Sequence, residues 1–390
     1  MRILVTGLIG QYAFGGVTWD YLQYVLGFQK LGHEVWYLED TATWAYDPIK
    51  QEPSADCSYN VNYLSRIMEK FGLGDRWVYR NEADGSYHGI SNAQQAEKMI
   101  READVLANVS GACWLREVTT SIPHKLFLDG DPMFTQIGLA LGTNKDYVDR
   151  VRAHSDHFSF GLNIGKENCL VPTAGLNWKP TVQPIALEYW QISKEDKLHP
   201  AQGAFTTVMN WASYKPQEFE GEEYGQKDIE FARFIDLPER VGLERMVVAM
   251  GQGVGQKRPT EELERKGWKI LEPDKVLPDY ETYRTFLQRS KGEWSIAKNG
   301  YVKSRSGWFS CRSACYLAAG RPVVVQDTGW SEYLPSGQGI LKFNSLEEAV
   351  EGIKEISTHY SQHAHKAREL AKEYFEAGKV CRQLLEESGL

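Results

Sequence analysis

Short apolar runs alternate with stretches of helical periodicity in the first half of the chain. Arg2–Thr6 predicts a buried strand, and Val17–Leu31 carries apolar residues at helical spacing before Gly32. A glycine-rich loop at 7–16 joins that strand to the helix, and a second strand is predicted over His33–Leu38. The later predicted elements of this half are the strands Val105–Asn108, Lys125–Leu128, His157–Phe160 and Cys169–Pro172, and the helix Gln94–Glu102. Such alternation is typical of parallel βαβ units in a doubly wound sheet.

The same alternation restarts in the second half. Lys179–Gln202 contains three prolines and has the composition of a linker. The predicted strands that follow are Ala204–Met209, Arg245–Ala249, Trp268–Leu271, Trp294–Ala297 and Val323–Val325. We therefore expect an α/β protein with two Rossmann-like domains that face each other across a cleft. The expected boundaries are residues 1–190, 191–360 and a C-terminal helical segment at 361–390.

The stretch Gly307–Gly329 has the pattern of a site for anions. It contains a short helix rich in small residues that breaks at Gly320, then the strand Val323–Val325 and a polar loop. The first backbone amides of a helix lack partners within the helix and lie at the positive end of its dipole. Phosphate groups bind such helix starts, so this stretch predicts a phosphate site.

Composition narrows the classes of function. The chain has 390 residues, a hydrophobic content of 42% and a net charge of −8, which argues against nucleic acid as the main partner. The six cysteines form no C-x-x-C pair, and no apolar run has the length of a membrane span, so we expect a reduced, cytoplasmic protein. The histidines have no acidic residue or cysteine at ligand spacing, so no metal site is expected. The 12 Trp and 20 Tyr are suggestive of sugar binding, which uses flat aromatic faces.

Two regions resemble the glycosyltransferases of the GT-B fold. The start, RILVTG followed by GGVTWDYLQYVLGFQKLGHEVWYL, is similar to their N-terminal strand, glycine loop, helix and second strand. SACYLAAGRPVVVQDTGWSEYL resembles their donor-domain signature, a helix that ends in A-x-G-x-P-V-V before a polar loop. The resemblance implies a nucleotide-sugar donor held by the C-terminal domain and an acceptor held by the N-terminal domain. It also implies chemistry in the cleft without a metal or a separate cofactor, and a C-terminal helix that packs back on the N-terminal domain.

The sequence departs from this family at two positions. Retaining members with a Glu-x7-Glu pair would have glutamates at the positions of Gly307 and Cys315, and plant-type inverting members would have His and Glu there. Neither pattern is present, so the stereochemical outcome does not carry over. The diphosphate would have to be held differently in detail.

The candidate donor-binding residues lie in loops that follow predicted strands or at the starts of predicted helices, and Arg312 lies in the first turn of the short helix in Gly307–Gly329. They are Gly15, Gly16, Trp211, Lys227, Lys298, Arg305, Ser310, Arg312, Ser313, Asp327 and Thr328. Glycine amides, hydroxyls and cations suit a diphosphate, and Asp327 suits sugar hydroxyls. Each also has a plainer reading: the glycines as an ordinary turn, the cations as surface charge, and Asp327 and Thr328 as turn residues.

Asp129 and Asp131 follow the strand KLFL in the predicted acceptor domain. A carboxylate there is placed to accept the proton of an acceptor hydroxyl, as an inverting transfer requires. Asp-Gly and Asp-Pro are also common turn sequences, and Asp20 and His124 are alternative bases.

The sequence thus favours a glycosyltransferase that moves a sugar from a nucleoside diphosphate to a hydroxyl of a small molecule or glycan. A nucleotide-sugar epimerase of the same fold and a non-catalytic nucleotide-sugar or glycan-binding protein remain alternatives.

Overall fold

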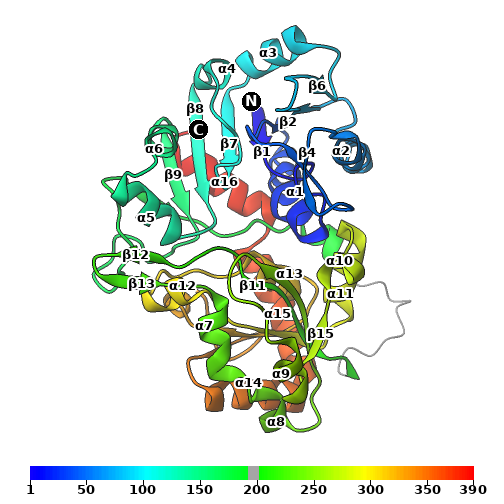
Figure 1. Cartoon of the computed structure of the whole chain (residues 1–390), viewed down its shortest axis with the longest axis vertical. Helices are drawn as coiled ribbons and strands as arrows, with labels where there is room; N and C mark the ends of the chain where they lie inside the picture. The colour runs from blue at the N-terminus through cyan, green and yellow to red at the C-terminus, as the bar shows by residue number, and fades with distance from the viewer. Residues whose placement is uncertain (192–201) are drawn as a thin grey trace.

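The computed structural model describes residues 1–191 and 202–390, and two parallel sheets organise them (Figure 1). The first sheet has the order β10-β9-β8-β7-β1-β2-β5-β6, and every pair is parallel except β5 with β6. Leu4 of β1 lies between Trp36 of β2 and Leu106 of β7. The strands are β1 (Arg2–Thr6), β2 (Glu34–Glu39), β5 (Trp77–Arg80), β6 (Tyr87–His88), β7 (Val105–Val109), β8 (His124–Asp129), β9 (Asp156–Ser159) and β10 (Trp178–Pro180).

The second sheet is entirely parallel and has the order β15-β14-β11-β16-β17-β18. Its strands are β11 (Phe205–Ala212), β14 (Met246–Gly253), β15 (Lys269–Leu271), β16 (Gly292–Ser295), β17 (Val323–Gln326) and β18 (Ile340–Phe343). In both sheets the first strand is central, and the chain adds strands on one side before it crosses to the other. This is the Rossmann order, so the predicted architecture is confirmed.

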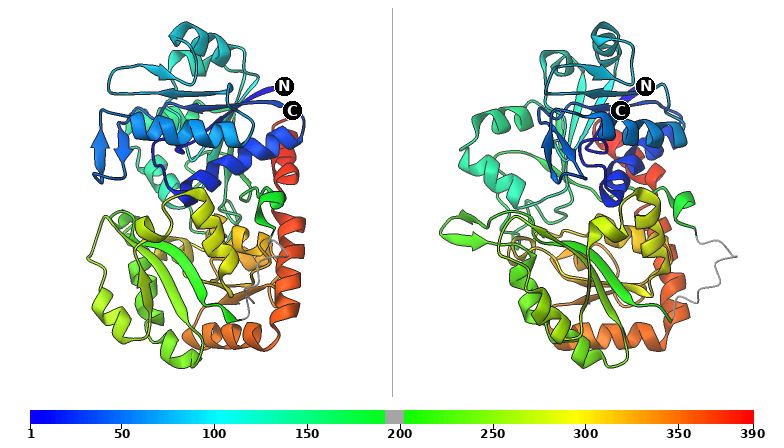
Figure 2. Two further views of the ribbon diagram at one scale, coloured as in Figure 1. Left: turned by 90° about the vertical axis from the view of Figure 1, so that its right-hand side faces the viewer. Right: turned by 45° about the vertical axis from the view of Figure 1, so that its right-hand side comes forward.

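Helices cover both faces of each sheet (Figures 1 and 2). Those beside the first sheet are α1 (Gly15–Lys30), α2 (Ser58–Lys70), α3 (Ala93–Arg101), α4 (Glu117–Thr120), α5 (Phe134–Leu141) and α6 (Lys145–Arg152). Those beside the second are α7 (Lys227–Phe231), α8 (Leu237–Val241), α9 (Thr260–Arg265), α10 (Pro273–Val276), α11 (Tyr280–Arg289), α12 (Asn299–Lys303), α13 (Cys311–Ala318) and α14 (Leu346–Thr358). Two hairpins, β3 (Ala45–Asp47) with β4 (Glu52–Ser54) and β12 (Gln217–Phe219) with β13 (Glu222–Tyr224), lie outside the sheets.

One predicted strand is wrong. Cys169–Pro172 is a loop, and the edge of the first sheet is formed instead by Trp178–Pro180. The apolar residues that suggested the strand do not all face a core, since Leu170 is 56% exposed. Most of the predicted linker joins the two sheets, but its residues 192–201 lie outside the described part of the chain.

The chain crosses back to the first sheet at its end. Where one helix was expected over His363–Glu387, there are two, α15 (Tyr360–Tyr374) and α16 (Ala377–Glu387). Figure 2 shows α15 beside the second sheet and α16 beside the first. At the junction the Ala377 amide donates to the Ile185 carbonyl at 2.9 Å. Helix α16 packs closely on α1 at Gly27. A Cβ at this position would overlap the Cys381 sulfur.

The start of α1 packs against α11 of the second domain. A Cβ on Gly15 would overlap the carbonyl oxygen of Asp279, and a Cβ on Gly16 would lie 3.2 Å from the ring of Tyr283. The indole of Trp19 donates to the carbonyl of Tyr280 at 2.8 Å. The largest buried apolar cluster accordingly includes residues of both domains. Among the described helices, none combines the length and the apolar character needed to cross a membrane.

Candidate functional site

A cavity of about 570 Å³ lies where the carboxyl ends of the two sheets face each other. In each sheet this edge includes the point where the strand order reverses, which is where open α/β sheets bind ligands. The first domain lines the cavity with residues of α1 and of the loops after β7 and β8, among them Asp20, Tyr24, Ser110, Asp129 and Asp131. The second domain lines it with Asn210, Ser213, Lys227, Lys298, Tyr301, Ser310, Cys311 and Arg312.

Helix α13 begins at this cavity without a side-chain cap. Ser310 is the N-cap residue, with extended backbone angles (φ −68°, ψ 132°), and its hydroxyl makes no capping hydrogen bond. The first amides of the helix therefore lack an internal acceptor. Ser310 and Arg312 both line the cavity, so the sequence-predicted phosphate helix does face the space between the domains.

Arg312 is held by the neighbouring strand. Its Nε donates to Oε1 of Glu293 at 2.7 Å, and its Nη2 donates to the Ser295 hydroxyl at 2.7 Å. Glu293 is completely buried on β16. Ser313, a predicted donor residue, is also buried and donates to Glu293 rather than lining the large cavity. Its hydroxyl thus supports the Glu293–Arg312 pair.

Lys227 is the first residue of α7 and lines the same cavity as Arg312. Within residues 1–191 and 202–390, no hydrogen bond or ion pair to its ammonium group is formed. Burial, and next the charge of Arg312, lower the pKa of Lys227 well below its usual value. A buried cation beside a second cation is electrostatically unfavourable unless an anion joins it. A bound anion would offset this cost and favour the charged form of Lys227.

Asp131 links the two domains. Its carboxylate accepts hydrogen bonds from Lys298 Nζ (2.8 Å), Tyr214 (2.6 Å) and Tyr301, all of the second domain. The Lys298 ammonium also lies 4.5 to 5.2 Å from the ring centroids of Phe134, Tyr214 and Tyr301. Burial, and next the charge of Asp131, raise the pKa of Tyr214, so this phenol remains a donor. Asp131, a predicted catalytic residue, and Lys298, a predicted donor-binding residue, thus both line the cavity but form an ion pair with each other.

Asp129 is fully enclosed by hydrogen-bond donors. Ser159 donates to it at 2.6 Å, Thr135 at 2.7 Å and Gln136 at 2.9 Å, and the amide of Asp131 donates at 3.0 Å. Burial raises the pKa of Asp129, while these donors oppose the rise. With its lone pairs occupied, Asp129 shapes the loop after β8. This geometry favours a structural role over the predicted catalytic one.

Asp20 is the cavity carboxylate with the features of a general base. It lies on α1, across from the start of α13. Burial raises the pKa of Asp20 to about 6, although a hydrogen bond from Cys311 and the charge of Arg312 oppose the rise. A carboxylate with a pKa near neutrality can both accept and release a proton. The sequence offered Asp20 only as an alternative base, and His124 lies at the start of β8, the edge opposite the cavity.

Besides Ser313, six predicted donor residues do not line the cavity, because local contacts use them. Gly15 and Gly16 allow α1 to approach α11 closely, as described above. Trp211 is buried in the core of the second domain, 5.5 Å from the ring of Phe231. Successive residues of a strand point to opposite faces, so its neighbour Asn210 lines the cavity instead. Arg305 is exposed and pairs with Glu332 at 2.9 Å.

The loop after β17 is also structural. Asp327 accepts from the Gly329 amide at 2.8 Å and from the Ser331 hydroxyl at 2.7 Å, which is the turn chemistry that the sequence left open. Thr328 is buried and donates to the Trp308 carbonyl at 2.7 Å. Neither residue lines the cavity. Asp327 thus fixes the turn that follows β17, and Thr328 ties this turn to Trp308 in the loop that precedes α13.

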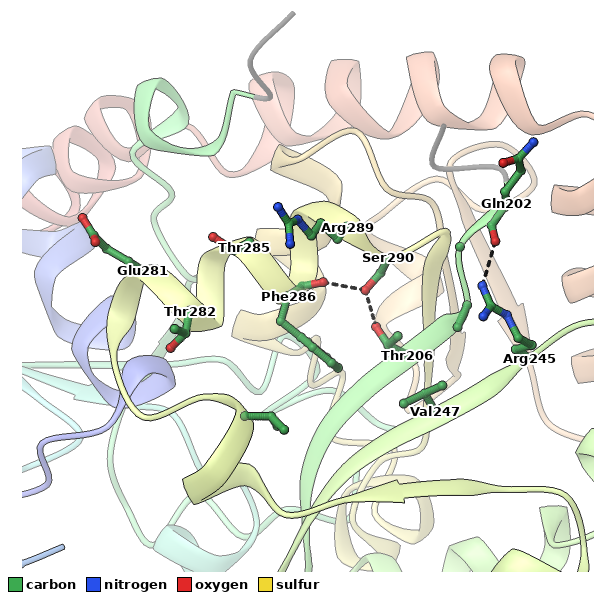
Figure 3. Close-up of a pocket in the computed structure, with 13 residues that line it drawn as sticks. Gln202, Thr206, Arg245, Val247, Glu281, Thr282, Thr285, Phe286, Arg289 and Ser290 are labelled. Carbon is green, nitrogen blue, oxygen red and sulfur yellow. Dashed lines mark hydrogen bonds between the residues drawn. The ribbon is translucent and has the colours of Figure 1, made fainter. Parts of the chain in front are cut away.

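A second cavity, of about 670 Å³, lies at the amino ends of β11 and β14 (Figure 3). Figure 3 shows Gln202 and Arg245 on one side of it and residues of α11 on the other. Its polar groups bond to one another: Arg245 donates to the Gln202 carbonyl at 2.8 Å, and the Thr206 and Ser290 hydroxyls lie 2.6 Å apart. Ligand sites of α/β sheets lie at the opposite edge, so the cavity between the domains is the candidate site.

Sequence reasoning missed Glu293, Tyr214 and Tyr301 as site residues. The signal for Glu293 was available, because a charged residue beside the apolar strand Trp294–Ala297 requires a buried partner. The sequence around Tyr214 and Tyr301 contains no comparable feature that marks them as site residues. In the described residues there is no group of three or more His, Cys, Asp or Glu side chains arranged to hold a metal ion.

Comparisons with known proteins agree with this architecture. No protein-family model matches the sequence, and no curated protein matches it either. Among solved structures, HepE from Anabaena in complex with UDP-glucose matches with a TM-score of 0.59, 12% identity and full coverage of both chains. An alpha-glucosyltransferase in complex with UDP and mismatched DNA has a TM-score of 0.56 and 13% identity, and the match covers 100% of this chain and 99% of that one.

A third match is AviGT4, a glycosyltransferase involved in avilamycin A biosynthesis, with a TM-score of 0.51 and 11% identity over 100% of this chain and 97% of that one. At such low identities the likeness concerns the fold, and it extends over both domains. The chain therefore has the GT-B fold that its two sequence regions predicted.

Proposed function

We propose that the protein is a glycosyltransferase that moves a sugar from a nucleoside diphosphate donor to a hydroxyl of a small-molecule or glycan acceptor. The observation that carries the proposal is Lys227, which has no partner among the described residues and lies beside Arg312 in a cavity at the carboxyl ends of both sheets. A diphosphate supplies the missing negative charge. The solved structures of similar fold that hold UDP or UDP-glucose support a nucleotide-sugar donor.

The donor half of the site belongs to the second domain. Lys227, Arg312 and the first amides of α13 would neutralise the diphosphate, and the Ser310 hydroxyl would add a donor. These groups also stabilise the negative charge that develops on the leaving nucleotide. Because the chain supplies this positive charge, we propose that the transfer needs no metal and no cofactor besides the donor.

The acceptor half belongs to the first domain, where Asp20 is the proposed base. Its carboxylate would take the proton of the acceptor hydroxyl as the sugar is displaced. Asp131 was the stronger candidate in the sequence, but Lys298, Tyr214 and Tyr301 occupy its oxygens. We assign Asp131 and Lys298 to the contact between the domains at this cavity.

The experiment starts with thermal shift measurements on UDP, GDP, ADP and thymidine diphosphate, with the free nucleosides as controls. A ligand that binds the folded state raises its melting temperature. At least one diphosphate should raise it, and its nucleoside should raise it less. If no nucleoside diphosphate shifts the melting temperature at millimolar concentration, the proposal is wrong.

Turnover with the matching nucleotide sugar separates the proposed function from its alternatives. A transferase releases the nucleotide faster when hydroxyl compounds from an acceptor panel are added, and the sugar is then found on the acceptor. Conversion of the donor sugar into its epimer without an acceptor would identify an epimerase. Binding without release or conversion across the panel would favour a binding protein.

A further inference from the structure

We infer that Glu293 is a positioning residue that fixes the Arg312 guanidinium so that one of its edges is presented to the donor diphosphate. The inference rests on the proposed function, since it concerns the same cavity. It adds a residue that does not itself line that cavity. Glu293 would act through Arg312 and not by contact with the ligand.

The guanidinium has five N–H donors in a fixed plane. The inner edge of Arg312 is used by the strand: Nε donates to Glu293 Oε1, and Nη2 donates to the Ser295 hydroxyl, each at 2.7 Å. In the described part of the chain, Nη1 has no hydrogen-bond partner. The outer edge, formed by Nη1 and the second hydrogen of Nη2, thus keeps its donors. A phosphate matches such an edge with two parallel hydrogen bonds.

Glu293 is itself held in place on every side. Oε1 also accepts from the Thr207 hydroxyl at 3.3 Å, and Oε2 accepts from the Ser313 hydroxyl. These partners come from β11 and α13, so the carboxylate joins β16 to the neighbouring strand and to the helix that begins at the cavity. Complete burial leaves the carboxylate few other orientations. The result is a guanidinium whose plane is set before the ligand arrives, which lowers the entropic cost of binding.

The variant Glu293→Gln tests the inference, because the two explanations predict opposite changes in the affinity for UDP. If Glu293 acted only through its charge, its removal would leave more positive charge at the site and UDP would bind more tightly. If Glu293 positions Arg312, the loss of the ionic contact frees the guanidinium, and UDP binds more weakly in spite of the added positive charge. We expect the dissociation constant of UDP to rise about tenfold, because a charge-assisted contact contributes on this order.

Calorimetry with UDP, pyrophosphate and uridine completes the design. Weakening should appear for UDP and pyrophosphate but not for uridine, which lacks the phosphates. In an Arg312→Ala background, Glu293→Gln should weaken UDP binding no further, because there is no guanidinium left to position. The matched control is Glu222→Gln, which removes a surface carboxylate paired with Lys303 and should leave UDP binding unchanged.

The outcomes separate this inference from the proposed function. If wild-type protein binds UDP and Glu293→Gln binds it equally or more tightly, Glu293 is not a positioning residue and the donor site stands. Equal weakening for uridine and UDP would indicate a general disturbance of the domain and also overturns the inference. If the wild-type protein binds neither a nucleoside diphosphate nor pyrophosphate, the donor site and this inference fail together. A Glu293→Gln protein that does not fold is replaced by Arg312→Lys, which keeps the charge, loses the fork and should show the same selective weakening.

Discussion

Replacing Lys227 by Met should have opposite effects on nucleotide binding and on the stability of the free protein. The side chain lines the cavity beside Arg312 without an anionic partner in the described structure. In the free protein its charge is therefore unfavourable, and methionine keeps the length of the chain without the charge. In the complex the same charge would contact the diphosphate.

The expected magnitudes follow from the burial of this ammonium. Two unit charges about 4 Å apart interact by about 4 kcal/mol at an effective dielectric constant of about 20. Hydrogen bonds that involve a charged group contribute roughly 1.5 to 3 kcal/mol net. We therefore expect Lys227→Met to lose about 2 to 3 kcal/mol of UDP binding, or about 30- to 150-fold in the dissociation constant. Relief of the unpaired charge should stabilise the free protein by about 1 kcal/mol, or roughly 2 °C in melting temperature.

Protonation gives an independent readout. Burial and Arg312 lower the pKa of Lys227 in the free protein, and a bound diphosphate raises this pKa again. UDP binding should therefore be coupled to proton uptake by Lys227, and the uptake should diminish as the pH falls below the pKa of this lysine in the free protein. Calorimetry in buffers of different ionisation enthalpy measures this uptake, which Lys227→Met should abolish.

Lys303→Met is the matched control, because Lys303 pairs with Glu222 on the surface and lies outside the cavity. It should change neither affinity nor proton uptake. A Lys227→Met protein that binds UDP like the wild type, or that has a lower melting temperature at unchanged affinity, would refute the reasoning.

Further predictions address catalysis, the domain contact and the packing. Asp20→Asn should lower kcat about 10²- to 10⁴-fold with little effect on UDP binding. In the wild type, kcat should fall below about pH 6, because the base must be ionised and the pKa of Asp20 is about 6; a pH-rate profile without this limb would contradict the assignment. Asp131→Asn should lower kcat/KM less than about 10-fold, because the Asp131 carboxylate pairs with Lys298 and does not act as the base. A loss larger than that of Asp20→Asn would identify Asp131 as the base. Transfer should persist in excess EDTA, and its loss with recovery on adding a divalent cation would show metal dependence. Gly15→Ala should lower the free energy of unfolding by roughly 1 to 3 kcal/mol in chemical denaturation, because its Cβ would overlap the Asp279 carbonyl. Gly74→Ala is the control and should cost much less, because the nearest atom to its Cβ, the Cα of Glu69, lies 3.7 Å away.

Local sequence patterns predicted much of the fold. The apolar run of Val323–Val325 and the helical spacing after Gly16 are properties of neighbouring residues, and both elements form where expected. The prediction was wrong for Cys169–Pro172, because an apolar run becomes a strand only if a neighbouring strand accepts it. It was incomplete for the C-terminal helix, which divides at the junction where Ile185 bonds to Phe375 and Ala377. That junction depends on residues almost 200 positions apart.

The amino-acid sequence by itself determined the two Rossmann-like halves and the short helix that breaks at Gly320, because these depend on short-range periodicity and on the small residues of α13. Only the tertiary structure decided which polar residues share the cavity. Gly15 packs against α11 and Asp129 belongs to a buried hydrogen-bond cluster, whereas Lys227 has no partner in the described part of the chain and lies beside Arg312. The physical reason is that hydrogen bonds and ion pairs form between groups that meet in space. Whether a charged side chain is satisfied by the protein or left for a ligand therefore depends on contacts that sequence spacing does not encode.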